Sequence, residues 1–279
     1  MKTESIKYYL NQKYYQGKGV IITGATGGIG SLLMATLVEL GARVVAVVKD
    51  EKKFKEILNS NNINPELVQV EKMDFKLDTN YREFFSNIMY KLKGKLDVMF
   101  LCHGHFNKGE IIETALKTYD EEININTRSV MAMISLATPF LKHTKGNVVA
   151  ISSLESIIPV KGSFLNTVSK SMVNMIIQNS ALELASFGIR INGVAPGVTN
   201  TMFRKNEYEE PKDENNNIYM TSVGQNNLLS NDVIQPDDVV DTMLFLGCDD
   251  ANFVTGEIIK IDNGYSLNHD LSYSSFKQL

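Results

Sequence analysis

The chain is poor in the residues on which several classes of protein depend. It has no Trp, two Cys among 279 residues, and no apolar run near the ~18 residues of a membrane span. Its 28 basic and 32 acidic side chains leave a net charge of −4, which gives no electrostatic case for nucleic-acid binding. Cys102 and Cys248 are too few for a disulfide framework and lack metal-ligand spacing, so we expect no metal. Residues 1–18 lack the apolar core of a signal peptide, and we expect a soluble cytoplasmic protein.

Short apolar runs alternate with helical patterns along almost the whole chain. The runs are rich in β-branched residues and nearly continuous, which is typical of strands buried on both faces. Such an alternation predicts an α/β fold with a single-domain, doubly wound parallel sheet of about seven strands, Rossmann-like, with helices on both faces. The runs are Val20–Ile22, Val44–Val48, Val68–Val70, Val98–Cys102, Val148–Ile151, Ile189–Val194 and Ile258–Ile261.

The spacing of apolar residues predicts two helices. Ile29, Leu33, Leu37 and Leu40 fall on one stripe, and Gly41 follows where a helix C-cap is expected. The stretch Ser169–Leu184 has the same kind of periodicity. The helical pattern therefore fits between the predicted strands.

The chain shows no linker and no internal repeat, so we expect one domain. We assign residues 1–17 to an N-terminal lead-in, 18–265 to a dinucleotide-binding domain and 266–279 to a C-terminal tail. Residues 202–235 are polar, rich in Asn and Glu, and weakly periodic. A stretch of this kind inside a compact domain is either a functional lid or disordered. Because it follows a predicted strand end, where such sheets bind ligands, we expect a substrate lid.

A glycine-rich turn joins the first predicted strand to the first helix. It contains Gly24, Gly27, Gly28 and Gly30 in the order strand, turn, helix. Glycine lets the backbone approach a pyrophosphate closely, and the helix N-terminus offers N–H groups and the positive end of its dipole. The context predicts a dinucleotide-binding turn rather than a merely structural one.

The turn reads Thr-Gly-x-x-x-Gly-x-Gly, and the chain resembles the short-chain dehydrogenase/reductase family from about Gly17 to Tyr265. Further landmarks occur in the family's order: Asp74-Phe75, Asn126, Ser152-Ser153, Pro196-Gly197, Val254-Thr255-Gly256 and Asp262-Asn263-Gly264. The resemblance implies a nicotinamide dinucleotide cofactor, with Asp74 holding the adenine ring. The cofactor-binding residues that it implies are Thr23, Gly24, Thr26, Gly28, Ile29, Gly30, Lys49, Asp74, Phe75, Gly104, Lys170, Pro196, Gly197, Thr199 and Thr201.

The end of the second strand bears on the choice of cofactor. NAD-preferring members of the family have an Asp there, and this chain has Val48 followed by Lys49. An apolar residue removes the repulsion of a 2′-phosphate, and Lys49 can pair with that phosphate. We therefore favour NADP(H), although Asp50 keeps NAD(H) open and Lys49 could be only a solvated loop charge.

The resemblance also implies a catalytic set of Asn, Ser, Tyr and Lys, in which Tyr exchanges a proton with the substrate. Asn126, Ser153 and Lys170 match this set, but the Tyr position, four residues before Lys170, holds Asn166. No Tyr occurs between Tyr119 and Tyr208, so a shift in alignment does not restore one. Ser153 and Lys170 also suit a protein that binds the dinucleotide without turnover.

The fourth strand departs from the family as well, since it ends Leu101-Cys102-His103-Gly104 instead of Asn-Asn-Ala-Gly. Three substitutes for the missing phenol remain open. They are water held by Asn166, Ser153 and Lys170, an imidazole of His103 or His105, and a phenol of Tyr208 or Tyr219. The two histidines also suit a purely structural role.

Two functions follow as alternatives. The first is an NADP(H)-dependent oxidoreductase acting on a small carbonyl or secondary alcohol, weak or atypical because the Tyr is absent. The second is a cofactor-binding pseudoenzyme that serves as a redox sensor or structural subunit. Met202, Phe203, Tyr208, Tyr219 and Met220 would line an apolar to mixed substrate pocket. The resemblance implies a homodimer or homotetramer, which the apolar run 131–134 fits, although burial within one chain would explain that run equally well.

Overall fold

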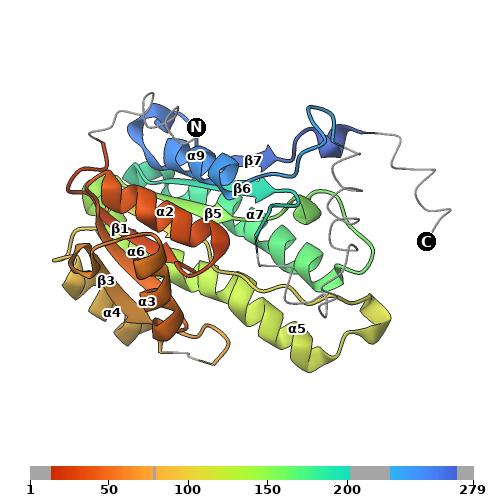
Figure 1. Cartoon of the computed structure of the whole chain (residues 1–279), viewed down its shortest axis with the longest axis horizontal. Helices are drawn as coiled ribbons and strands as arrows, with labels where there is room; N and C mark the ends of the chain where they lie inside the picture. Colours follow the sequence, from red (N-terminus) through yellow and green to blue (C-terminus); the bar gives the residue numbers. More distant parts are fainter. Residues whose placement is uncertain (1–13, 78–79, 202–226, 269–279) are drawn as a thin grey trace.

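Seven parallel strands form one sheet in the computed structural model, which describes residues 14–77, 80–201 and 227–268. Their order is β3-β2-β1-β4-β5-β6-β7, so the chain reverses direction across the sheet between β1 and β4 (Figure 1). Ligands bind at such a switch point in doubly wound sheets. The strands are β1 (Gly19–Thr23), β2 (Arg43–Val48), β3 (Val68–Lys72), β4 (Val98–Leu101), β5 (Asn147–Ile151), β6 (Arg190–Pro196) and β7 (Ile258–Ile261). The predicted fold class and all seven predicted strands are confirmed.

Helices cover both faces of the sheet. Helices α2 and α9 lie on one face, and α4, α6 and α7 lie on the other. A short π-helical turn, Asn124–Arg128, joins α5 to α6. The helices are α2 (Gly28–Glu39), α3 (Glu51–Ser60), α4 (Tyr81–Lys91), α5 (Leu116–Ile123), α6 (Ser129–Thr144), α7 (Phe164–Leu184) and α9 (Pro236–Gly247).

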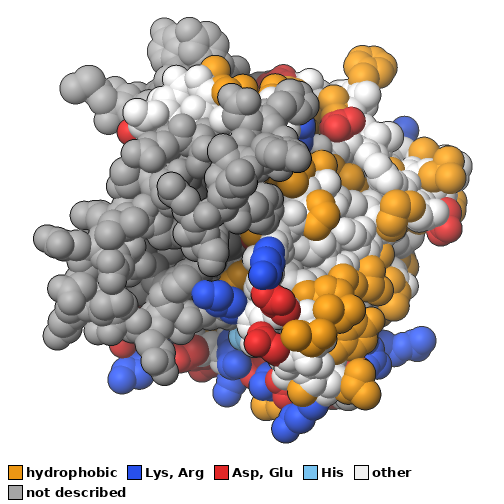
Figure 2. Space-filling view, turned by 90° about the vertical axis from the view of Figure 1, so that its right-hand side faces the viewer, with side chains coloured by type: hydrophobic (Ala, Val, Ile, Leu, Met, Phe, Trp, Pro, Cys, Tyr) orange, Lys and Arg blue, Asp and Glu red, His pale blue; other side chains and the backbone are white. Residues whose placement is uncertain are grey.

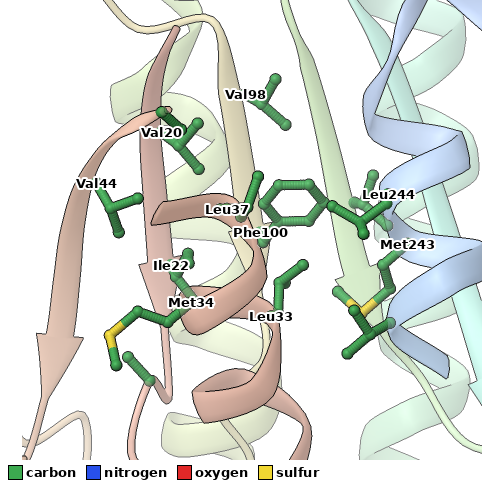
Figure 3. Packing of buried hydrophobic residues seen from close by; sticks show 14 of the residues in the cluster. Val20, Ile22, Leu33, Met34, Leu37, Val44, Val98, Phe100, Met243 and Leu244 are labelled. Atoms are coloured by element: carbon green, nitrogen blue, oxygen red, sulfur yellow. The ribbon is translucent and has the colours of Figure 1, made fainter. Parts of the chain in front are cut away.

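The strand residues point alternately into two hydrophobic cores. Val20 and Ile22 of β1 pack under α2 and α9 with Leu33, whereas Ile21 faces the opposite core. Figure 3 shows the first of these cores, in which Phe100 of β4 lies between α2 and α9. Because side chains alternate along a strand, an uninterrupted apolar run is what burial on both faces requires.

The structure shows where two of the helices predicted from the sequence begin or end. Helix α2 ends at Glu39, and Gly41 follows with a φ of 78°, as expected of a residue that closes a helix. Helix α7 begins at Phe164, earlier than the periodicity from Ser169 predicts. Its first turn buries Leu165 and Asn166, so it includes a polar residue that the apolar pattern did not mark.

Some of the apolar side chains are buried within the chain, and others are exposed on its surface. In the run 131–134, Met133 and Ile134 are buried and Met131 is half exposed. Near α5, the large side chains Ile111 and Ile112 are exposed. Figure 2 shows hydrophobic side chains gathered on the face that it displays. Burial within the chain thus accounts for two members of the run.

Among the helices of the described ranges, none combines the length and the apolar character that a membrane crossing requires.

Candidate active site

A cavity of about 680 Å³ opens where the carboxyl ends of β1, β4, β5 and β6 meet. It brings together the glycine turn, the segment after β4, the segment after β5 and the start of α7. The predicted site residues that line it are Thr26, Gly28, Ile29, Gly30, Gly104, Ser153, Asn166, Lys170, Pro196, Gly197, Thr199 and Thr201. Those that lie outside its lining are Thr23, Gly24, Lys49, Asp74, Phe75 and Asn126.

The glycine turn is shaped so that only glycine fits at its tightest points. Gly24 has a φ of 65°, and a Cβ on Gly30 would lie 2.3 Å from the Gly24 carbonyl oxygen. Helix α2 begins at Gly28 with Gly27 as its N-cap, which supplies no side-chain acceptor, and its first turn holds no acidic residue. The N–H groups and the positive end of the helix dipole therefore remain for an anion. This cradle fits a pyrophosphate.

The charges beside β2 form two separate contacts. The Lys49 ammonium lies 3.1 Å from a carboxylate oxygen of Asp74, and the Lys49 side chain is exposed. Asp50 is the N-cap of α3 and accepts the N–H groups of Lys52 and Lys53, and these two backbone hydrogen bonds lower the pKa of its carboxyl. Lys53, from the first turn of α3, lines the cavity. The sequence patterns did not mark Lys53, although its place after the N-cap Asp50 was a usable signal.

The His103 ring is buried just after β4, where it bridges β1 and α6. Its Nδ1 lies 2.6 Å from Thr23 Oγ1, and its Nε2 lies 2.6 Å from Ser129 Oγ. Ser129 Oγ donates to the Ile125 carbonyl at 2.5 Å, so it accepts from Nε2, and Thr23 in turn donates to Nδ1. Burial lowers the pKa of His103 to about 3, so the ring is neutral near pH 7.

Cys102 and Phe75 also lie beside His103. Thr23 Oγ1 accepts the Cys102 N–H at 3.1 Å, and the Phe75 ring lies 4.2 Å from the His103 ring, measured between centroids. Burial raises the pKa of the Cys102 thiol far above its usual range. His103 is therefore a structural histidine, which leaves it unsuited to supply a proton.

Ser153 and Asn166 lie together beside a buried carboxylate. Ser153 Oγ accepts the Glu155 N–H at 3.2 Å and an N–H of Asn166 at 3.4 Å. Asn166 Nδ2 also donates to Glu155 Oε2 at 2.5 Å, and Ser163 Oγ donates to the other Glu155 oxygen at 3.3 Å. Asn166 Oδ1 is buried and has no hydrogen-bond partner within the described part of the chain. The amide is therefore oriented by Glu155, and the Ser153 hydroxyl keeps its own hydrogen for a ligand oxygen.

Lys170 lies one helical turn after Asn166 and is almost completely buried. Its ammonium donates to the Ile151 carbonyl oxygen, at the end of β5, at 2.8 Å. Burial lowers the pKa of Lys170 to about 8, and the nearby charge of Glu122 opposes that shift. An ammonium has three donors, so this group can also bind hydroxyl groups in the cavity.

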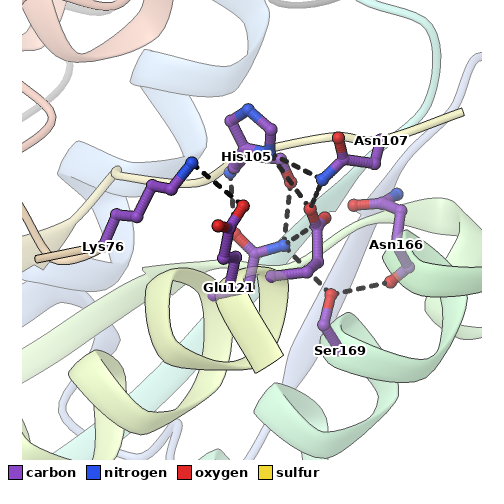
Figure 4. A network of polar contacts seen from close by, with 8 residues as sticks. Lys76, His105, Asn107, Glu121, Asn166 and Ser169 are labelled. Carbon is purple, nitrogen blue, oxygen red and sulfur yellow. Dashed lines mark hydrogen bonds and ion pairs between the residues drawn. The ribbon is translucent and has the colours of Figure 1, made fainter. Parts of the chain in front are cut away.

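Asn126 fixes the segment after β4 instead of facing the cavity. Its Oδ1 accepts the His105 N–H at 2.7 Å, and its Nδ2 donates to the His105 carbonyl at 2.8 Å. The same amide nitrogen lies within hydrogen-bond distance of Glu122 Oε1 and Ser169 Oγ (Figure 4). Asn126 lies in the π-helical turn, a type of distortion that is frequent at functional sites.

Two buried acids are prominent in the site and were missed by the sequence patterns. Glu122 is fully buried and lies one helical turn before Asn126, a spacing that places both on one side of the helix. Glu155 is buried two residues after Ser153. Neither matches a familiar motif, and part of what holds each of them, Asn107 for Glu122 and Asn166 for Glu155, comes from another element of the chain.

The remaining sequence expectations concern the edge of the cavity. Thr199 pairs with Ile234 in an isolated bridge, and a Cβ on Gly28 would lie 2.7 Å from the Thr201 side chain. Most of the expected lid, 202–226, lies outside the described residues, as do Met202, Phe203, Tyr208, Tyr219 and Met220. Within the described ranges, no group of three or more His, Cys, Asp or Glu side chains is arranged to hold a metal ion.

Comparisons with known proteins agree with this arrangement. The model of the family described as "Enoyl-(Acyl carrier protein) reductase" matches residues 24–266. A relative from Arabidopsis thaliana, "Short-chain dehydrogenase reductase 5", is 30% identical over 255 residues, which cover 90% of this chain and 95% of the relative. The "7alpha-hydroxysteroid dehydrogenase" of Clostridium sardiniense is 26% identical over 259 residues, covering 91% of this chain and 95% of that protein.

A solved structure shows the same fold with a cofactor. The structure described as "ElxO with NADP Bound" has a TM-score of 0.81 and 26% sequence identity, and the match covers 90% of this chain and all (100%) of that chain. The match of one family model to most of the chain, together with these relatives, identifies its family. The chain belongs to the short-chain dehydrogenase/reductase family of Rossmann-fold oxidoreductases.

Proposed function

We propose that this protein is an NADP(H)-dependent oxidoreductase that interconverts a carbonyl and a secondary alcohol in a small molecule. The observation that carries the proposal is that the glycine turn, Ser153 and Lys170 line the same cavity. A relative named as a hydroxysteroid dehydrogenase and a structural neighbour with NADP bound support the same class of reaction.

Each lining group has a role that its geometry supports. The N-terminus of α2 holds the pyrophosphate, and the Lys170 ammonium binds ribose hydroxyls. The Ser153 hydroxyl donates to the substrate oxygen. The bound cofactor supplies the hydride, and the chain supplies orientation and the proton.

The preference for NADP(H) rests on charge. Two ammonium groups, Lys49 and Lys53, lie around the N-terminus of α3, and Lys53 lines the cavity. The nearby carboxylate of Asp50 is committed to two backbone N–H groups as the helix cap. A 2′-phosphate would therefore meet the Lys53 ammonium, and Lys49 could pair with it by exchanging its contact with Asp74.

The proposal includes Asn166 at the family's Tyr position. A primary amide does not donate a proton near neutral pH, and loss of a positioned general acid costs about 10²- to 10⁴-fold in rate. Orientation and hydride transfer do not depend on that group. We therefore propose turnover that is weaker than, or different in its proton donor from, that of a Tyr-containing member.

A cofactor-binding pseudoenzyme is the second candidate, and one observation favours it. Both N–H groups of Asn166 are directed at Glu155 and Ser153, and Lys170 donates to a backbone carbonyl. These contacts would also stabilise a site that binds the dinucleotide without reaction. In that case the protein would act as a redox sensor or as a subunit of an assembly.

Further parts of the proposal follow from the family. We propose that residues 18–265 form the cofactor-binding domain, that 202–235 form a substrate lid, and that the protein assembles as a homodimer or homotetramer. The apolar side chains exposed near α5 and at Met131 are consistent with contacts beyond one chain.

Cofactor binding and turnover separate the two candidates. NADPH should raise the melting temperature more than NADH does, and the wild-type chain should oxidise NADPH in the presence of some members of a panel of aldehydes and ketones. A melting shift without oxidation, joined to a large gain of oxidation in Asn166→Tyr, would support the pseudoenzyme. The absence of any shift with either cofactor would refute both candidates.

A further inference from the structure

Glu155, a buried acid just after β5, binds two side chains from the start of α7. One oxygen of its carboxylate accepts an N–H of Asn166 at 2.5 Å, and the other accepts the Ser163 hydroxyl at 3.3 Å. All three side chains are buried. Glu155 is not among the described residues that line the cavity, so any effect on a ligand must pass through its neighbours.

The Ser163 hydroxyl bonds this carboxylate although Ser163 is the N-cap of α7. A serine at this position usually accepts a backbone N–H of the first helical turn, but the Ser163 side chain makes no such bond. Its backbone is fixed by an isolated bridge to Gly109, whose carbonyl accepts the Phe164 N–H. The start of α7 thus forgoes a side-chain cap, and the Ser163 hydroxyl holds Glu155 instead.

The Asn166 amide, on the first turn of α7 (Figure 4), is held in one of its two orientations. Its Nδ2 donates to Glu155 Oε2 at 2.5 Å and to Ser153 Oγ at 3.4 Å. Its Oδ1 is buried and finds no hydrogen-bond partner in the described part of the chain. Turning the amide over would place Oδ1 against the carboxylate, which offers only acceptors. Glu155 therefore fixes the orientation, although one buried acceptor stays unpaired.

These contacts determine what the Ser153 hydroxyl can do. Its oxygen accepts the Asn166 N–H and, at 3.2 Å, the backbone N–H of Glu155. A hydroxyl oxygen has two acceptor sites and one hydrogen, so both acceptor sites are filled and the hydrogen is left to donate. Ser153 lines the cavity. Glu155 contributes to both bonds that set this direction, one through its backbone and the other through Asn166.

We propose that Glu155 is a positioning residue of the reaction, which acts through Asn166 to keep the Ser153 hydroxyl a donor to the oxygen of the reacting carbonyl. This inference rests on the proposed function and gives Asn166 a role other than that of a proton donor. Asn166 is the link, because its amide joins the carboxylate to the serine. A buried acid outside the cavity lining is thereby coupled to the chemistry inside it.

Hydrogen exchange at the Asn166 side-chain amide tests this link without any measurement of activity. Isotope labelling of the asparagines makes their amide hydrogens visible by NMR, and the signals missing in Asn166→Ala assign this residue. Both Nδ2 hydrogens are donated inside the protein, so in the wild type they should exchange at least about 100-fold more slowly than those of a free amide. Glu155→Met keeps the side-chain length and removes the acceptor, so exchange should become at least about tenfold faster.

Three variants test the effect on the reaction. Glu155→Met should lower kcat/KM for a carbonyl about 10- to 100-fold, because a small misplacement of a substrate-binding group costs that much, while NADPH affinity stays within about twofold. Glu155→Gln keeps an oxygen for Asn166 and an amide that can donate to Ser163, so it should restore kcat/KM to within about fivefold of the wild type. Glu183→Met, at an exposed position in the last turn of α7, is the matched control and should keep the wild-type rate.

A double-mutant cycle tests whether Asn166 is the route. In an Asn166→Ala background, Glu155→Met should change kcat/KM by less than about twofold, because the residue through which it acts is already gone. Losses that multiply in the double variant would show that Glu155 affects the site by another route. That result would overturn the inference.

A shorter acid keeps the inference testable where Glu155→Met does not fold. Glu155→Asp retains the carboxylate but draws it back by one methylene, so it should lower kcat/KM about tenfold and speed exchange at Asn166. Equal rates in the wild type, Glu155→Gln and Glu155→Asp would contradict a positioning role.

Failure of this inference differs from failure of the proposed function. Asn166 hydrogens that exchange equally in the wild type and in Glu155→Met, or a Glu155→Met variant that keeps the wild-type rate, would overturn the positioning role alone. A wild-type chain that binds NADPH but oxidises it with no carbonyl would overturn the proposed function, and the role of Glu155 in the reaction with it, even where the exchange result is as expected.

Discussion

The two halves of the cavity are built from different parts of the polypeptide. On the nucleotide side, the turn between β1 and α2 offers backbone N–H groups, a helix end and glycines that permit close approach. On the reaction side, the groups are side chains held by other side chains, above all Asn166 by Glu155 and His105 by Glu122. The first half depends on backbone shape and the second on a polar network.

This difference accounts for the glycine turn that resembles the family's and for the departure that we propose at Asn166. A backbone cradle tolerates few substitutions, because a single Cβ in the wrong place blocks the turn. A polar network can exchange one residue for another as long as its buried donors and acceptors remain paired. The reaction side is therefore where a change in chemistry can arise without loss of the fold.

The largest expected effect breaks the nucleotide side. In Gly30→Ala, the new Cβ would lie 2.3 Å from the Gly24 carbonyl oxygen, so the turn must open. We expect NADPH affinity to fall by about 100-fold or more, equivalent to at least roughly 2.7 kcal/mol. Isothermal titration with NADPH measures this loss directly.

Gly27→Ala is the matched control for that variant. Its Cβ would lie 3.3 Å from the same oxygen, and its φ of −81° is accessible to any residue. We expect its NADPH affinity to remain within about fivefold of the wild type. Equal affinity of both alanine variants would contradict a cradle made by close backbone approach.

The contrast between the halves also decides what the sequence could predict. The alternation of apolar runs predicted all seven strands, because strands buried on both faces leave a continuous signal. The order of glycines predicted the turn for the same local reason. Glu122, Glu155 and Lys53 were not predicted, because they depend on partners and positions that the fold brings together, such as Asn107 beside Glu122 and Asn166 beside Glu155. The place of His105 beside a carboxylate was equally invisible, since Glu122 lies in another element.

His103 connects the two halves, and its titration sharpens the comparison. It joins Thr23 at the end of β1 to Ser129 of α6, and burial lowers its pKa to about 3 from an ordinary 6.5. The unfolded chain therefore binds a proton below pH 6.5 that the folded chain refuses, so stability is lost as the pH falls from 6.5 towards 3. At pH 5 the loss is about 2 kcal/mol, or roughly 30-fold in the folding equilibrium constant.

Urea unfolding of the wild type and of His103→Gln at pH 7 and pH 5 measures this contribution. The glutamine cannot titrate, so the free energy of unfolding of the wild type should fall by about 2 kcal/mol more than that of the variant between the two pH values. The same variant should leave NADPH oxidation close to wild type, because the His103 ring is buried and both of its nitrogens bond hydroxyl groups of the chain. Equal pH dependence in both chains would show that His103 becomes protonated without unfolding.

The smallest expected effect tests the proposed preference for NADP(H) on the nucleotide side. Lys53 lines the cavity from the first turn of α3, where Asp50 already caps the helix. Removing one exposed ammonium beside a phosphate costs about 1 kcal/mol, so Lys53→Gln should weaken NADPH binding about fivefold and leave NADH binding unchanged. Lys52→Gln lies in the same helical turn outside the cavity lining and serves as the control. If Lys53→Gln weakened both cofactors equally, the ammonium would act on the shared pyrophosphate, and the charge that favours NADP(H) would have to come from Lys49.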